Sequence, residues 1–94
     1  MILWEQESLN DREKIFAYLY QYNPEVAEKT DDLIVKQVTN LLDHPKLGVK
    51  REGVRGRRLI LPELSLIVAY EASDQGIHIL RVLHQKQQFP HISV

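Results

Sequence analysis

The sequence predicts an α+β fold, in which an N-terminal strand and a helical hairpin pack on a small antiparallel sheet. Apolar residues in the first half recur three and four positions apart, as they do on one face of a helix. After His44-Pro45 the pattern becomes extended, and short apolar runs are separated by sequences typical of tight turns. Strands joined by tight turns pair antiparallel, so the second half supplies the sheet that the helices cover.

The composition predicts a single domain over residues 1–94. Ninety-four residues suffice for one hydrophobic core, and 44% hydrophobic with 27% charged residues is ordinary globular composition. We find no internal repeat and no linker. The chain has no cysteine, which excludes disulfides and Cys-ligated zinc and suits a reducing cytoplasm.

The N-terminal segment predicts a strand and then a helix. Ile2-Leu3-Trp4 favours a strand, and Ser8 can cap a helix from about Leu9 to Tyr22, with Asp11 in its first turn. The apolar positions that share one face of this helix are Leu9, Ile15, Phe16, Leu19 and Tyr22.

A second helix is expected from about Pro24 to Asp43. Asn23 is a favoured N-cap residue, and proline suits the first helical position. Because only one or two residues separate the helices, they must fold back as a hairpin. The predicted buried stripe is Val26, Thr30, Leu33, Ile34, Gln37, Val38, Leu41 and Leu42.

Three strands are predicted after the helices, over Arg57 to Leu61, Leu64 to Glu71 and Ile77 to Leu83. Pro62-Glu63 and Ser73-Asp74-Gln75-Gly76 form the turns between them. The preceding segment, Lys46 to Arg58, indicates a basic loop or a short twisted strand. In the last strand neither alternating set of residues is cleanly apolar, so the sequence does not decide which set faces the core.

Charge is divided unevenly along the chain, although the formal net charge is only −1. Residues up to His44 include four Lys or Arg and nine Asp or Glu, whereas later residues include eight Lys or Arg and four Asp or Glu. A basic half favours an anionic ligand or an acidic protein partner. The candidate binding cations are Lys50, Arg51, Arg55, Arg57, Arg58, Arg81 and Lys86, and we expect them to share one surface.

A second candidate constellation joins Arg81, His84 and Lys86 at the end of the last strand with Tyr70 from the strand before. Histidine exchanges protons near neutral pH, and Arg or Lys can stabilise charge on a phosphate, so these residue types suit RNA cleavage. The alternatives are that the basic loop is simply a solvated surface and that His84 is a surface residue.

Metal, cofactor and membrane functions have no support in the sequence. The four histidines show no metal-binding spacing and no glycine-rich phosphate loop is present, so we expect no metal and no cofactor. The longest apolar runs fall far short of the roughly 20 residues of a membrane-spanning helix. The N-terminus lacks the pattern of a secretory signal, so we expect a cytoplasmic protein that starts at Met1.

Several segments, in this order, resemble the ParE/RelE superfamily of toxins from bacterial toxin-antitoxin modules. The first is Trp4 to Asp43 with its Leu41-Leu42-Asp43-His44-Pro45 ending, and the next are Gly48 and Arg55-Gly56-Arg57. Ile67-Val68-Ala69-Tyr70 and the closing Ile79 to Gln87 resemble the plasmid-stabilisation, ParE-like branch, so the resemblance covers nearly the whole chain.

The resemblance implies a fold of two helices over a small antiparallel sheet, and a cognate antitoxin in a toxin-antitoxin hetero-oligomer. ParE-like members inhibit DNA gyrase and are not nucleases, whereas RelE-like members cut mRNA on the ribosome. Ile67 stands near the position where RelE-like nucleases carry an arginine, and the chain lacks their strong basicity. His84, with Arg81 and Tyr70, keeps the nuclease alternative open, so the sequence leaves undecided whether the protein is an enzyme.

Arg55, Arg57, Arg58 and Arg81 are expected to pair with acidic side chains of the antitoxin, across an interface above about 1,000 Å². A third alternative is a non-toxic interaction module whose basic face binds an acidic protein. Three classes of protein are therefore left open: a protein-binding toxin, an endoribonuclease and a structural adaptor.

Overall fold

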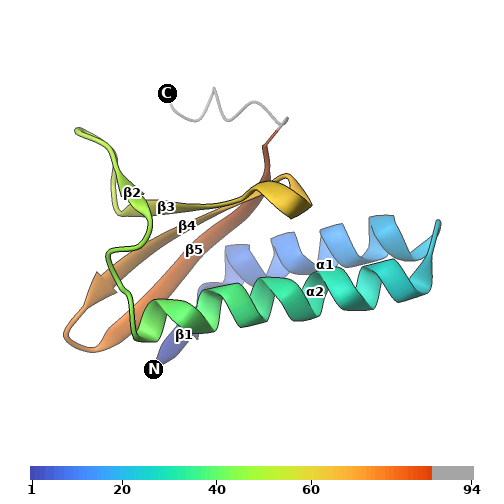
Figure 1. The fold of residues 1–94 in the computed structure, drawn as a ribbon, viewed down its shortest axis with the longest axis horizontal. Helices are drawn as coiled ribbons and strands as arrows, with labels where there is room; N and C mark the ends of the chain where they lie inside the picture. The colour runs from blue at the N-terminus through green and yellow to red at the C-terminus, as the bar shows by residue number, and fades with distance from the viewer. Residues whose placement is uncertain (86–94) are drawn as a thin grey trace.

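The computed structural model describes residues 1–85, and Figure 1 shows their arrangement. Two helices lie side by side beneath one face of a five-stranded sheet. In chain order the elements are β1 (Ile2–Trp4), α1 (Gln6–Tyr20), α2 (Pro24–Thr39), the 3-10 helix η1 (Asn40–Leu42), β2 (Val49–Lys50), β3 (Arg57–Leu61), the 3-10 helix η2 (Pro62–Leu64), β4 (Leu66–Ser73) and β5 (Gly76–His84).

The sheet has the strand order β1-β5-β4-β3-β2. The four later strands pair antiparallel, which confirms the predicted α+β fold and its hairpin turns. β1 instead joins the edge of the sheet parallel to β5, with Ile2 opposite Ile77 and Trp4 opposite Ile79, so the complete sheet is mixed. The ends of the described chain are thereby tied together, because the first strand pairs with the last.

The N-cap predicted for the second helix is confirmed, and the one predicted for the first helix is not. The Asn23 side chain accepts hydrogen bonds from the backbone N–H groups of Glu25 and Val26, which confirms the predicted cap of α2. The predicted cap of α1 is wrong: the helix begins at Gln6, and Ser8 lies inside it, fully buried. The Ser8 hydroxyl donates to the Glu5 carbonyl oxygen at 2.7 Å, so it satisfies the backbone from within the first turn.

Two consecutive residues of α1 bind different parts of the fold. The Arg12 guanidinium lies 4.4 Å from the ring centroid of Trp4 on β1, and it donates two hydrogen bonds to Asp31 on α2, at 2.9 and 2.8 Å. Asp11 instead accepts hydrogen bonds from β5, from Arg81 and from the Val82 backbone N–H. Helix α1 is therefore held to the sheet and to α2 by polar contacts as well as by packing.

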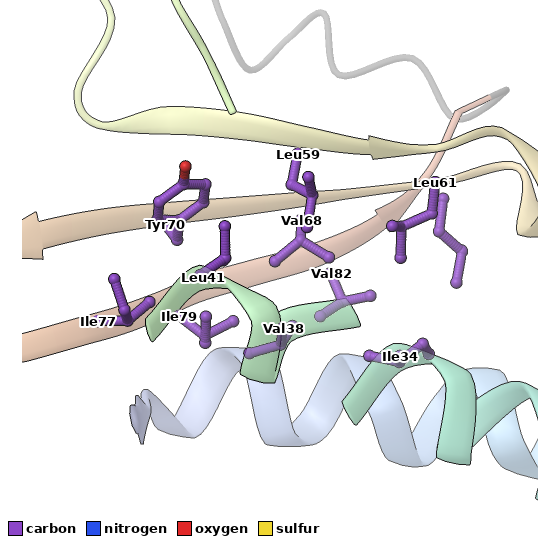
Figure 2. Packing of buried hydrophobic residues seen from close by; sticks show 11 residues of the cluster. Ile34, Val38, Leu41, Leu59, Leu61, Val68, Tyr70, Ile77, Ile79 and Val82 are labelled. Atoms are coloured by element: carbon purple, nitrogen blue, oxygen red, sulfur yellow. The ribbon is translucent and has the colours of Figure 1, made fainter. Parts of the chain in front are cut away.

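The core lies between α2 with η1 and the inner face of β3, β4 and β5 (Figure 2). The second helix predicted to Asp43 is divided into α2 and η1. It contributes less of the core than predicted, because Val26, Leu33 and Leu42 are exposed; Ala27, which was not predicted to be buried, is. The buried cluster is Ile34, Val38, Leu41, Leu59, Leu61, Leu66, Val68, Tyr70, Ile77, Ile79 and Val82.

A β-bulge explains why the last strand shows no clean alternation. Tyr70 lies opposite Ile79 but Ala69 lies opposite Arg81, so Leu80 is an extra residue in β5. The inward-facing set therefore changes from Ile77 and Ile79 to Val82 along one strand. Bulges re-aim side chains, and here Arg81 reaches the edge of β5 that faces α1.

Candidate protein-binding site

A groove of about 720 Å³ lies between the helical hairpin and the C-terminal end of β5. We call it the hairpin groove. Its apolar lining comes from α1, α2, η2, β4 and β5, and charged side chains of α1, η2 and β5 line it as well. Protein-binding surfaces commonly combine apolar side chains with polar and charged ones. The apolar residues are Ile15, Leu19, Val26, Leu64, Leu66, Val82 and Leu83, and the charged or titratable ones are Asp11, Lys14, Glu63, Arg81 and His84.

Arg81 in this groove is already held by acidic residues of α1. Its Nε and Nη2 atoms donate to the two Asp11 carboxylate oxygens at 2.8 and 3.0 Å, and Glu7 lies 4.0 Å away. These hydrogen bonds raise the pKa of Arg81 above its ordinary value, against the opposing effect of burial. Asp11 also accepts from the Val82 backbone N–H at 2.9 Å, so it closes the edge of β5 that β1 is too short to cover. In this structure Arg81 therefore serves to hold α1 against β5.

The nuclease candidates are only partly brought together. Arg81 and His84 line the same groove. Tyr70, in contrast, is 0% exposed in the core; its hydroxyl donates to the Pro45 carbonyl oxygen and accepts from the Gly48 backbone N–H, both at 2.8 Å. Tyr70 therefore anchors the segment before β2. Because its side chain is buried, it is not placed to contact a substrate.

The remaining candidate cations lie elsewhere. Lys50 and Arg57 line a second groove beside the β4–β5 turn, at the end of β5 opposite Arg81, and Arg57 also donates to the Gly48 carbonyl oxygen at 3.0 Å. Arg55 pairs with Glu71, Arg51 is exposed in the loop before β3, and Arg58 is half-buried in β3. Lys86, like His91, lies outside the described residues. Arg58 lies opposite Ala69, which lies opposite Arg81, whereas Lys50 and Arg57 line a different groove from Arg81. The candidate cations therefore do not all line one groove.

Sequence reasoning missed Asp11 and Glu71, the carboxylates that hold Arg81 and Arg55. Asp11 was assigned only to the helix dipole, although Glu7 and Asp11 stand four residues apart and so share a face of α1. That acidic face was the available signal for a cation on a neighbouring strand.

Among residues 1–85 no cluster of three His, Asp or Glu residues suits a metal ion, and neither helix of that part is long and apolar enough to cross a membrane.

The Arg55 and Glu71 pair should be visible in a pH titration. The hydrogen bond from Arg55 lowers the pKa of Glu71 below its ordinary value of 4.5, although burial opposes the shift. A lowered folded-state pKa means that the pair stabilises the fold above that ordinary value, and that this contribution is lost as the pH falls through the lowered pKa. In Arg55→Gln, the Glu71 carboxyl observed by NMR should therefore titrate at higher pH.

Arg51→Gln is the matched control, because Arg51 lies in the same loop but is not among the groups that shift the pKa of Glu71. It should leave the Glu71 titration unchanged. Equal titration curves in the wild type and Arg55→Gln would contradict the assigned pair.

The fold defines a class: a small α+β protein in which a helical hairpin packs on one face of a five-stranded sheet, with the hairpin groove at one end of β5. A solved structure described as the chromosomal ParDE TA system from P. aeruginosa matches this fold with a TM-score of 0.76 and 27% identity, covering 88% of this chain and 92% of that chain. A curated protein of Sinorhizobium fredii (strain NBRC 101917 / NGR234), named "Putative toxin Y4kP", is 29% identical over 91 residues, covering 97% of this chain and 94% of its own length.

A family model confirms the resemblance noted in the sequence. The model for the ParE toxin of the type II toxin-antitoxin system, parDE, matches residues 2–89. The chain therefore belongs to the ParE toxin family of type II toxin-antitoxin systems.

Proposed function

We propose that this ParE-family toxin acts in the cytoplasm as a single domain, arrests growth by inhibiting DNA gyrase, and is neutralised by a cognate antitoxin. The observation that carries the proposal is the hairpin groove, whose apolar lining offers area for a protein to bury and whose arginine is already neutralised by Asp11. Burial of Tyr70 removes one of three candidate nuclease residues and supports gyrase over RNA as the target.

The antitoxin contact is proposed in the hairpin groove. An amphipathic segment can lay its apolar face on Ile15, Leu19 and Leu64, as helices do in other hydrophobic grooves. Lys14 in the groove lining offers a cation to an acidic antitoxin side chain, which promotes fast association. The resulting assembly is a toxin-antitoxin hetero-oligomer.

Val26→Glu tests the antitoxin contact. Val26 is 43% exposed and lines the groove, so a carboxylate there should weaken antitoxin binding by at least about tenfold while leaving the fold intact. Growth arrest by Val26→Glu should persist when the antitoxin encoded beside it is expressed from a second plasmid. Purified proteins would give the affinity by titration calorimetry.

Val35→Glu is the matched control, since Val35 is 38% exposed on the same helix and outside the groove lining. It should remain fully neutralised. Neutralisation of Val26→Glu as efficient as that of the control would place the antitoxin somewhere else.

The target is tested with the purified chain in two assays. We expect loss of gyrase supercoiling activity, with mRNA on translating ribosomes left uncut. The nuclease alternative keeps one observation in its favour, because Arg81 and His84 share the groove. Ribosome-dependent cleavage that His84→Gln abolishes would establish that alternative, and induction without any growth arrest would favour the non-toxic interaction module.

A further inference from the structure

The outer edge of β4 is incompletely paired. β3 pairs with β4 only as far as Arg57 opposite Tyr70, whereas β4 continues to Ser73, paired on its other side with β5. Within residues 1–85, Glu71, Ala72 and Ser73 therefore have a neighbouring strand on one side only. An open strand edge is a template for another extended chain.

The gap beside this edge is enforced by Gly56, which precedes β3. Gly56 has a positive φ of +74°, and a Cβ atom there would lie only 2.3 Å from the Tyr70 carbonyl oxygen. Gly56 therefore packs against the β4 backbone in a conformation that only glycine allows, and residues 52–56 are turn or bend that do not pair with β4 as a strand. The open edge is therefore built into the fold.

Cations surround the open edge. A groove of about 800 Å³ contains Glu71, Ala72 and Ser73 in its lining, together with Lys46, Lys50 and Arg57. We call it the β4-edge groove. Its carboxylates are Asp74 and Glu71, and Glu71 is occupied by Arg55. The cations therefore outnumber the carboxylates that remain available to them.

The mixed lining discriminates between anionic partners. A nucleic acid places a negative charge on every nucleotide and would meet both carboxylates in the groove. An extended peptide directs alternate side chains to opposite sides, so it can point its acidic groups at the lysines and its small groups elsewhere. The N–H and C=O groups of an open strand edge can also form the ladder of hydrogen bonds of a β-sheet with a peptide backbone, and a nucleic acid has no such backbone.

We propose that the β4-edge groove binds an extended, acidic peptide segment of a partner protein, which adds as a strand to Glu71, Ala72 and Ser73 while its carboxylates meet Lys46, Lys50 and Arg57. This site lies at the end of β5 opposite the hairpin groove. A partner at one site therefore leaves the other accessible. The inference goes beyond the proposed function, since it requires neither gyrase inhibition nor toxicity.

The test uses the full chain and a fluorescein-labelled eight-residue peptide of alternating glutamate and valine. Fluorescence anisotropy should show saturable binding that weakens when the salt concentration is raised from 50 to 300 mM, because exposed charge pairs are screened. Lys46→Glu/Lys50→Glu should weaken binding by at least about tenfold, through lost attraction and new repulsion. Lys29→Glu/Lys36→Glu carries the same change of charge on exposed positions of α2 and should bind as the wild type does.

Two further probes separate edge pairing from simple charge attraction. The same peptide with alternate backbone nitrogens methylated keeps every carboxylate but loses half of its donors, and it should bind at least about tenfold more weakly. Equal binding of the methylated peptide, or equal binding by Lys46→Glu/Lys50→Glu, would overturn the proposal. So would tight binding of a single-stranded RNA octamer that the acidic peptide fails to displace.

Discussion

Asp11→Ala is expected to lower the free energy of unfolding by about 2 to 3 kcal/mol, a large share of the stability of a domain this size. The Asp11 side chain is only 11% exposed and accepts three hydrogen bonds, two from Arg81 and one from the Val82 backbone N–H. Alanine leaves that N–H without its partner and Arg81 without its counter-ion. Because the Arg81 side chain is 43% exposed, water recovers part of the loss, and the estimate stays below that for a fully buried pair.

Urea unfolding followed by circular dichroism measures this effect, provided that the slope of the transition is unchanged. Asp32→Ala is the control, because Asp32 is exposed on α2, and its removal should cost less than about 0.5 kcal/mol. A loss for Asp11→Ala no larger than the control's would show that Asp11 does not hold the edge of β5.

Tyr70→Phe is expected to destabilise the protein by about 2 kcal/mol and to release the segment before β2. The ring stays in the core, so hydrophobic burial is unchanged, but the Gly48 N–H loses its acceptor and the Pro45 carbonyl loses its donor. Gly48 is packed so closely against this ring that a Cβ atom there would lie 2.7 Å from it. The hydroxyl is therefore the main polar contact between the core and this segment.

Amide hydrogen exchange gives the local readout. In Tyr70→Phe the Gly48 amide should exchange faster than in the wild type, while amides in the middle of β4 should change only with global stability. Tyr20→Phe removes a hydroxyl from a 49% exposed side chain and should change neither stability nor exchange. Unaltered protection of Gly48 in Tyr70→Phe would contradict the anchoring role.

The elements that local chemistry specifies were predicted well. The cap at Asn23 with Pro24, the turn at Ser73 to Gly76 and the limits of β3 all follow from residues adjacent in sequence. The parallel pairing of β1 with β5 was not predicted, because it joins residues more than 70 positions apart. The bulge at Leu80 was also missed, since one extra residue reverses the alternation on which strand assignment depends.

The candidate site was predicted less well, for a related reason. Residue type alone was enough to single out Arg81, Arg55 and Tyr70 as candidates. Their roles in the structure depend on partners that only the fold brings close, namely Asp11, Glu71 and the Pro45 carbonyl group. A count of cations along the sequence cannot show which of them are already neutralised. The apolar lining of the hairpin groove was equally hidden, because it comes from five separate elements.

The adjacent anchors on α1 have a consequence for the partner binding proposed at the hairpin groove. Asp11 fastens the helix to β5, and Arg12 fastens it to Trp4 and Asp31, so the helix can neither roll nor slide without breaking one of these attachments. The α1 side of the hairpin groove is thus preorganised, and a segment that binds there does not have to meet the cost of ordering this helix as well. Loosening either anchor should shorten the lifetime of the complex even where no contact with the partner is removed.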